Sequence, residues 1–299
     1  MERLLEKHFP ILSIEQDCIL SKMGDITVTY QATLPEIFTL SDRDYEAFHQ
    51  AWIKAIKTLP KNSILHKQDW FTESSHQADF SKDNQSFLNR SSERFFHERP
   101  FLDHSCYLFL TLKPKNRKPS SSLFSTLLRS HIIPEGLNLP NALPEFLDAC
   151  GQFERILSDS GFVSLSRLKE DWLYSNQTQI GVLEKYCSLN TEKEPIWISD
   201  IRFKPSLQVG NKSCRIFSIS ETDDLPLLCG SRINYDKYST DTTKFSVGFA
   251  SSLGQLLPCN HIYNQYLFIG DAQQTLKELE SKRLRSFGPG YPETVPTSR

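Results

Sequence analysis

Three residues whose side chains can exchange protons or bind ions lie within the stretch SILHKQDWF, namely His66, Lys67 and Asp69. A histidine beside an aspartate can act as a general base, so the stretch is a candidate piece of an active site. In an extended chain, however, alternate side chains point to opposite faces, which separates His66 from Asp69. The stretch therefore predicts a polar strand near a sheet edge or at a domain surface. One face would hold Ile64, His66, Gln68 and Trp70, and the other Leu65, Lys67, Asp69 and Phe71.

The residues of this strand are expected to differ in their effect on stability. Trp70 shares a face with His66 and carries the larger apolar area, so Trp70→Ala should destabilise the protein by roughly 3 kcal/mol or more. A half-exposed histidine contributes about 1 kcal/mol through its hydrogen bond. We expect His66→Ala to cost much less and to show an effect only when a binding partner is present.

A metal site is the second chemistry to consider. The stretch HERPFLDHSC places His97, His104 and Cys106 close together, and His104 and Cys106 would share one face of a strand. A structural zinc usually needs a fourth ligand with tight spacing, and none is nearby. The pattern favours hydrogen-bonded histidines and a buried cysteine, and we predict no metal ligand.

Nucleotide binding is the third chemistry to consider. SLQVGNKS, residues 206–213, ends in the Lys-Ser pair of a phosphate-binding loop, but Ser206 and Asn211 stand where that loop needs glycine. Gly210-Asn211 instead predicts a turn between two strands. No glycine-lysine pair occurs anywhere in the chain. The sequence therefore predicts no P-loop and no cofactor-binding residue.

The remaining polar groups predict no catalytic residue. The chain has no GxSxG elbow and no cysteine in a protease or redox pattern, although abundant Ser, His and Asp leave open a triad assembled by the fold. Asp223-Asp224 precede Pro226 in an expected loop. The basic residues within 113–122 could contact phosphates, but no aromatic residues alternate with them to stack on bases. They are Lys113, Lys115, Arg117 and Lys118.

Strands and helices must position these residues. The first third of the chain predicts the order strand, strand, helix, strand, helix, strand. Two strands, 11–20 and 25–34, are expected to form a hairpin with its turn at Met23-Gly24. Ser41 with Asp44 predicts a capping box for a helix that ends at Pro60. Its expected apolar stripe is Tyr45, Phe48, Trp52, Ile56 and Leu59.

The rest of the chain predicts helices followed by strands. Helices are expected at about 86–98 and 122–132, in 143–157 and across 166–189. Strands are expected near 104–112, 196–204, 206–210, 213–220, 244–250 and 261–269. A final helix, 272–286, is expected to turn Ala272, Leu276 and Leu279 inward.

Composition limits the class of protein. The 299 residues are 38% hydrophobic and 23% charged with a net charge of -2, which indicates a globular chain without bulk attraction to nucleic acid. Scattered cysteines, no signal peptide and no apolar run long enough to span a bilayer predict a cytoplasmic protein without a transmembrane segment. We predict an α+β fold with mixed, largely antiparallel sheets, packed helices and two lobes. Residues 1–112 would form the first lobe, 113–122 a mobile basic loop, 123–286 the second lobe with a helical middle, and 287–299 a disordered tail.

Five strings, in order and spread over nearly the whole chain, carry a resemblance to a known family. Together they resemble the N-terminal region of the TraG family of conjugative-transposon ATPases, which are VirB-type ATPases of type IV secretion. The strings are ILHKQDWF, SFLNRSSERFFHERPFLDHSCYLFLT, SRINYDKYSTDTTKFSVGFASSLGQLL, NHIYNQYLFI and LESKRLR. Family members continue into a RecA-like motor domain, whereas this chain ends in SFGPGYPETVPTSR, so we expect it to lack the motor.

The resemblance implies a docking and assembly module of a conjugation ATPase that is catalytically silent alone. ATP and Mg are then expected only for the missing motor domain. Its partners would be inner-membrane components of the secretion channel, with self-association as a further expectation and DNA contacted only indirectly. The protein would lie in the cytoplasm, peripheral to the inner membrane. The alternative is a stand-alone nucleic-acid-processing enzyme or DNA-binding protein that uses the basic loop.

Overall fold

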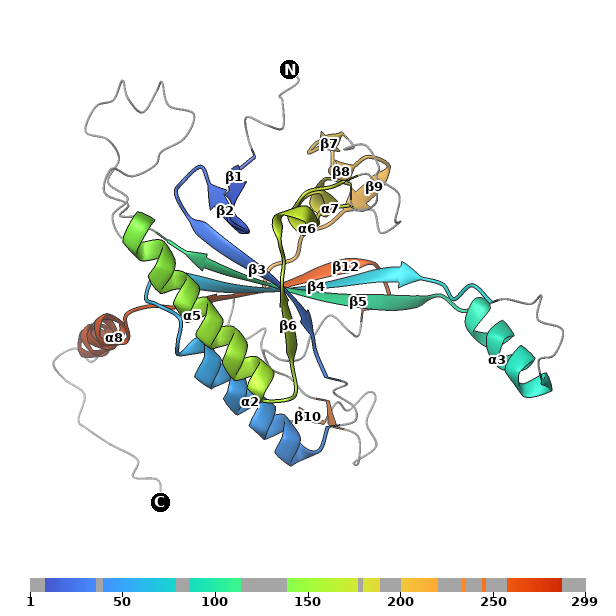
Figure 1. Cartoon of the computed structure of the whole chain (residues 1–299), viewed down its shortest axis with the longest axis horizontal. Helices are drawn as coiled ribbons and strands as arrows, with labels where there is room; N and C mark the ends of the chain where they lie inside the picture. The colour runs from blue at the N-terminus through green and yellow to red at the C-terminus, as the bar shows by residue number, and fades with distance from the viewer. Residues whose placement is uncertain are drawn as a thin grey trace.

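A computed structural model describes residues 9–35, 40–78, 86–113, 139–176, 180–188, 200–219, 233–234, 244–245 and 257–286. Its centre is a seven-stranded sheet in the order β1-β2-β3-β5-β4-β12, with β6 also paired to β3. Every pair in this sheet is antiparallel, and helices cover it, which confirms the α+β class (Figure 1). The strands are β1 (Ile11–Glu15), β2 (Cys18–Ser21), β3 (Ile26–Thr33), β4 (Ser63–Ser74), β5 (Phe101–Leu112), β6 (Ser164–Arg167) and β12 (His261–Phe268).

Two tight turns separate the N-terminal strands β1, β2 and β3. Gly24 has φ 79° in the predicted turn between β2 and β3, a conformation that glycine adopts without a steric cost. Residues 11–20 do not form the single strand that alternation predicts. Gln16 and Asp17, with φ 54° and 59°, make a second turn that separates β1 from β2. Short polar side chains such as aspartate tolerate this left-handed conformation better than branched ones.

Two long helices cover one face of the sheet. Helix α2 (Asp42–Ile56) has the predicted capping box, in which the backbone N–H of Asp44 donates to Ser41 Oγ at 3.2 Å. Helix α5 (Leu139–Asp159) packs beside it, and Trp52 of α2 meets Phe153 of α5 edge to face (Figure 1). Buried residues of the two helices in this core are Phe48, Ala51, Trp52, Ala55, Phe146, Cys150, Phe153 and Leu157.

Two strands from beyond residue 122 belong to this same sheet. β12 runs antiparallel along β4, with His261 opposite Phe71 and Phe268 opposite Ile64. β6 pairs with Tyr30–Thr33, the part of β3 that β2 leaves unpaired. The sheet therefore extends across the predicted limits of the two lobes at 112 and 123. A strand in sequence position 261–268 reaches β4 because unpaired backbone groups in a sheet must find partners, whatever their separation along the chain.

The opposite face of the sheet carries a smaller core. Residues 166–189, predicted as helix, instead begin with the end of β6 and continue into two short helices, α6 (Glu170–Leu173) and α7 (Val182–Ser188). Strand pairing with β3 outweighs the helical propensity of this segment. The buried residues of this second core are Ile14, Ile19, Trp70, Tyr107, Phe109, Leu168, Leu173 and Val182.

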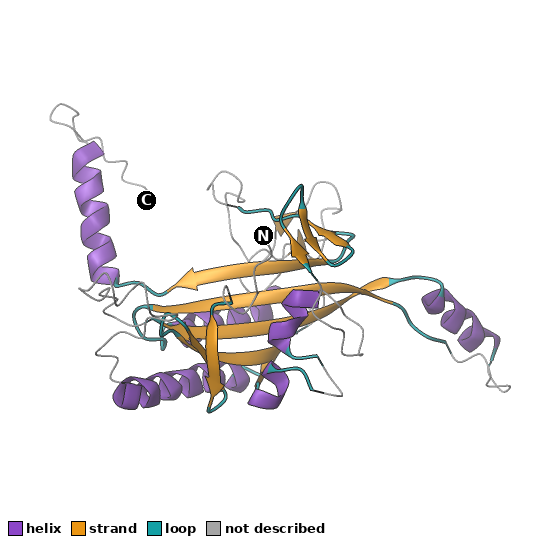
Figure 2. Cartoon of the chain, turned by 90° about the horizontal axis from the view of Figure 1, so that it is seen from above, coloured by secondary structure: helices purple, strands orange, loops and turns teal. Residues whose placement is uncertain are grey.

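Two helices lie away from the body, at opposite ends of the molecule (Figure 2). Helix α3 (Phe87–His97) follows the far end of β4, and α8 (Ala272–Ser286) follows β12. The prediction that Ala272, Leu276 and Leu279 of α8 face inward is wrong for Leu276 and Leu279, which are 58% and 57% exposed. None of the described helices is both long and apolar enough to cross a membrane.

The remaining strands are short. β7 (Ile201–Arg202), β8 (Leu207–Val209) and β9 (Lys212–Cys214) form a small sheet, and Gly210-Asn211 is the turn that the sequence predicts between β8 and β9. β10 (Ile233–Asn234) pairs with β11 (Lys244–Phe245). The expected helix at 122–132, the basic loop beyond Lys113, and the tail 287–299 lie outside the described residues.

Candidate functional site

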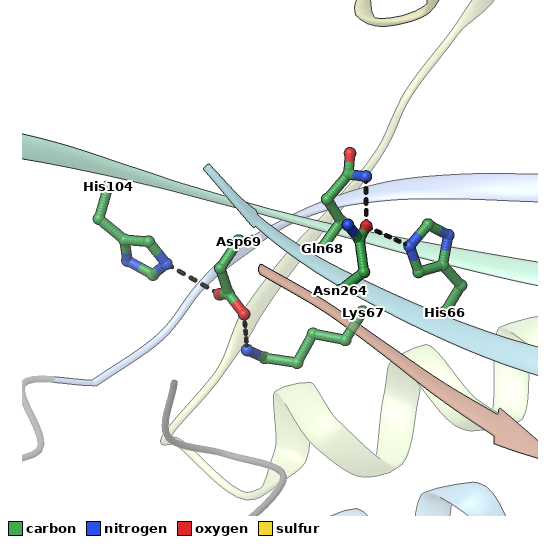
Figure 3. Close-up of polar contacts among 6 residues, drawn as sticks. All are labelled: His66, Lys67, Gln68, Asp69, His104 and Asn264. Atoms are coloured by element: carbon green, nitrogen blue, oxygen red, sulfur yellow. Dashed lines mark hydrogen bonds and ion pairs between the residues drawn. The ribbon is translucent and has the colours of Figure 1, made fainter. Parts of the chain in front are cut away.

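The candidate site is built on β4, whose side chains divide between the two faces of the sheet as predicted. His66 and Gln68 lie on one face of β4, and Lys67 and Asp69 lie on the other (Figure 3). Trp70 shares the first face and belongs to the smaller core, and Phe71 shares the second. His66 and Asp69 therefore form no dyad, which confirms that prediction. β4 lies near a sheet edge, as predicted, because it is the second strand from the β12 edge; it pairs with β5 on one side and β12 on the other.

An ionic network occupies one face. The Lys67 ammonium donates to Asp69 Oδ2, and both side chains are 0% exposed. His104 of β5 donates from Nε2 to Asp69 Oδ1 at 2.8 Å. Each carboxylate oxygen of Asp69 thus accepts a charged or polar hydrogen, which is the condition under which a buried charge is tolerated.

The surroundings hold the Asp69 carboxyl in its ionised form. Burial alone would raise its pKa, but the hydrogen bond from His104 and the positive charge of Lys67 outweigh burial and set the pKa below its ordinary value. Burial raises the pKa of the neighbouring Cys106 thiol, so this cysteine is not a reactive thiolate.

Stacked aromatic rings lie on the same face of the sheet as the ionic network. The ring of Phe71 stacks on His104 of β5 at 4.7 Å and on His261 of β12 at 4.6 Å between centroids. These three residues are directly opposite one another in the register of the three strands. The stack therefore spans β5, β4 and β12 and holds the outer strand against the sheet.

An amide network occupies the other face. Asn264 of β12 accepts at Oδ1 from His66 Nε2 at 2.8 Å and from Gln68 Nε2 at 2.7 Å. Gln68 Oε1 in turn accepts from Trp70 Nε1 at 2.7 Å and from the Tyr186 hydroxyl of α7. The two amides thus connect β12, β4 and α7 through side chains alone.

His66 is a half-buried member of this network. Its ring lies between Phe109 and Tyr266, with centroids 5.1 Å and 4.2 Å away. Burial lowers the pKa of His66, an effect that the hydrogen bond with Asn264 partly opposes. The histidine is therefore held in its neutral form near neutral pH.

Burial removes the Lys67 ammonium and the Asp69 carboxylate of β4 from solvent. Lys67 and Asp69 have no accessible surface, and the hydrogen bonds of the two networks run within β4 and from β4 to β5, β12 and α7. The arrangement attaches β12 to β4 from both faces. Sequence reasoning placed Lys67 and Asp69 on one face but missed their burial. The available signal was their opposite charge at positions i and i+2 of one strand, where two side chains point the same way.

The other predicted candidates do not converge. His97 lies in α3, whereas His104 is bound to Asp69 in the sheet. Within the described ranges, no three His, Cys, Asp or Glu side chains are grouped so that they could hold a metal ion. Lys212 and Ser213 are in β9, and Asp223-Asp224 lie outside the described residues, as do Lys115, Arg117 and Lys118.

β12 presents an outer edge that no strand in the described part of the chain pairs with. Its sequence, HIYNQYLF, has no Asp, Glu, Lys, Arg or Pro, the residues that usually protect an edge strand from pairing. Tyr266 and Phe268 on this strand are 57% and 68% exposed. Lys113 lies over the Phe268 ring at 5.7 Å. An uncharged edge with exposed aromatic rings is suited to receive an extended segment of another chain.

Comparison with known protein families finds a similarity in the N-terminal part of the chain. A family model described as a domain of unknown function, B. Theta gene description (DUF3875), matches residues 2–50. The match includes β1, β2, β3 and the start of α2. No curated protein matches the chain.

Proposed function

We propose that this chain is a docking and assembly module of a conjugative-transfer ATPase of type IV secretion, catalytically silent by itself. The resemblance to the N-terminal region of the TraG family suggests this role, and one structural observation supports it. The strings ILHKQDWF and NHIYNQYLFI lie within or overlap the neighbouring strands β4 and β12. Their polar side chains bind each other, so the chemistry of these strings serves to build a sheet edge and not to transform a substrate.

The docking surface in this proposal is the outer edge of β12. An inner-membrane component of the secretion channel adds an extended segment there, with backbone hydrogen bonds giving affinity and Tyr266 and Phe268 giving side-chain contacts. The module then lies in the cytoplasm, peripheral to the inner membrane, and contacts DNA only indirectly. In this proposal ATP and Mg bind to the RecA-like motor domain of the family and not to this module.

Capture of inner-membrane components tests the docking surface. Each component is co-expressed with the tagged full chain, and the retained amount is measured. Tyr266→Lys/Phe268→Lys should reduce capture of one component about tenfold, because an edge charge opposes strand addition. Phe203→Lys, also at an exposed phenylalanine, is the matched control and should capture as the wild type does. Undiminished capture by the double variant, or equal loss in the control, contradicts the proposal.

Nucleotide and DNA binding by the same chain distinguish the module from the enzyme alternative. Because the chain lacks the glycines of a phosphate-binding loop, calorimetry with ATP and magnesium should show no specific binding, and an ATPase assay should show no hydrolysis. Micromolar, magnesium-dependent binding would contradict a silent module. Tight DNA binding lost on replacing the basic residues of 113–122 would instead support the alternative that uses this loop.

A further inference from the structure

Helix α3 is carried on an arm that extends beyond the body of the protein. β4 and β5 pair along their whole length, from Ser63 opposite Leu112 to Ser74 opposite Phe101. The far end of this long hairpin continues into α3, away from α2 and α5 (Figures 1 and 2). None of the described side chains of α3 is buried.

The apolar residues of α3 are concentrated on one half of the helix. At 100° per residue, Phe87, Leu88, Phe95 and Phe96 fall within one half, and Arg90, Glu93, Arg94 and His97 in the other. Phe87 and Leu88 are 82% and 75% exposed, and Phe95, Phe96 and the adjoining Phe101 are 50–54% exposed. With roughly 150–250 Å² for each fully exposed phenylalanine, these residues form an apolar patch of several hundred Å².

Contacts on the polar half fix this orientation. His76, just past the end of β4, binds Glu93 at 2.8 Å between Nε2 and Oε2. The His97 ring donates from Nδ1 to the His76 carbonyl at 3.0 Å. Residues 76–78 thus lie against the polar half, whereas the apolar residues of the other half are exposed.

The size and charge of this surface favour a lipid bilayer over a protein partner. A stable protein interface buries about 800 Å² on each side, which is more than the apolar half of α3 offers. Between Phe87 and Arg99 the chain carries three arginines and two glutamates; Glu98 pairs with Arg94 at 2.7 Å, and Glu93 forms a hydrogen bond with His76. Arg99 lies over the Phe95 ring at 3.8 Å, at the margin of the apolar half, where a cation can reach lipid phosphates.

We propose that α3 is an interfacial membrane anchor, with its apolar half in the headgroup boundary of a bilayer and its arginines directed at lipid phosphates. Four phenylalanines and a leucine would supply the buried area, and Arg90 and Arg99 the attraction to anionic lipid, because Arg94 is already paired with Glu98. The inference stands on α3 and its contacts and does not depend on docking at β12.

Flotation of the full chain with vesicles tests the anchor. Wild type should float with vesicles of phosphatidylethanolamine and phosphatidylglycerol, and less with phosphatidylcholine alone. Phe95→Ser/Phe96→Ser should bind about tenfold more weakly, since it removes apolar area from the bilayer. Phe203→Ser/Phe217→Ser, which alters two exposed phenylalanines elsewhere, should bind as wild type does. Thermal melts should be unchanged for both variants.

A tryptophan at Leu88 gives a second, direct measurement. In Leu88→Trp, brominated lipids should quench the added fluorescence, because position 88 lies on the apolar half. Absence of wild-type flotation, equal flotation of the α3 variant, or an unquenched tryptophan overturns the proposal. A wild-type dimer that the α3 variant cannot form also overturns it, in favour of a protein interface. A chain that fails to float but is still captured through β12 refutes the anchor alone.

Discussion

The Lys67 ammonium can be buried because it is paired with the Asp69 carboxylate, which is buried with it. Asp69 would be strongly disfavoured as an isolated ion in the interior, but Lys67 and His104 satisfy both of its oxygens. The face of each residue follows from alternation along β4 and was predictable. Burial and the partner His104 were not predictable, because they depend on the register between β4 and β5, which a local pattern does not contain.

The ionic pair should respond non-additively to substitution. Lys67→Met leaves Asp69 buried without its cation and should destabilise the fold by about 3 kcal/mol or more. Adding Asp69→Asn removes the stranded charge, so the double variant should be more stable than Lys67→Met alone. Urea unfolding of the wild type, both single variants and the double variant measures this. Strict additivity would indicate that Lys67 and Asp69 do not interact.

His66 should make stability dependent on pH in the weakly acidic range. Its pKa in the folded state lies below the ordinary value of 6.5, so the unfolded state binds more protons between those two values. The contribution is present above 6.5 and is lost as the pH falls through the folded pKa. Tyr266, the titratable ring against His66, stays neutral there because burial raises its pKa further.

The melting temperature of wild type should therefore fall between about pH 7.5 and about pH 5.5. His66→Gln retains an amide donor toward Asn264 but does not titrate, so its decrease should be smaller. Other histidines contribute equally to both proteins, and the difference isolates His66. An identical decrease in the two proteins would show that His66 has the same pKa folded and unfolded.

Among the elements, those with strong local signals were predicted and those defined by distant pairing were not. Ser41 and Asp44 identify the start of α2, because a capping box is complete within four residues. The last two residues of β6, Ser166 and Arg167, were predicted to begin a helix over 166–189, but β6 is not helical. It is a strand because β2 pairs with β3 only as far as Val28, which leaves the edge at Tyr30–Thr33 for β6.

Helix α8 shows the limit of periodicity as a guide to burial. Its leucines have helical spacing, but the helix leaves the body after Asp271, whose carboxylate binds Lys61 at 2.8 Å. Leu276→Ser/Leu279→Ser should therefore change the free energy of unfolding by less than about 1 kcal/mol. Leu65→Ala, at a fully buried leucine of β4, should cost about 2–5 kcal/mol in the same urea titration. A comparable loss in the α8 variant would mean that α8 packs on the protein in solution.

At the scale of the molecule, one sheet combines strands from both predicted lobes. β12 and β6 come from beyond residue 122 and pair with β4 and β3, and α5 completes the core over α2. The α+β class was predictable from alternating strand and helix patterns. The contribution of residues 139–268 to the first sheet was not, because long-range pairing leaves no periodic signal along the chain.

The predicted division at 113–122 can be tested by separating the chain there. A fragment of residues 1–112 lacks Phe146, Phe153 and Leu157, each fully buried against α2 or the sheet. Losing one large core side chain costs about 2–5 kcal/mol, and whole domains are stable by only about 5–15 kcal/mol, so the fragment should not fold alone. Mixing it with residues 123–299 should restore a cooperative thermal transition and dispersed amide resonances, because the two parts share one sheet. A cooperative transition of 1–112 by itself would show that the N-terminal lobe is an independent domain, with β6 and β12 as later additions to its surface.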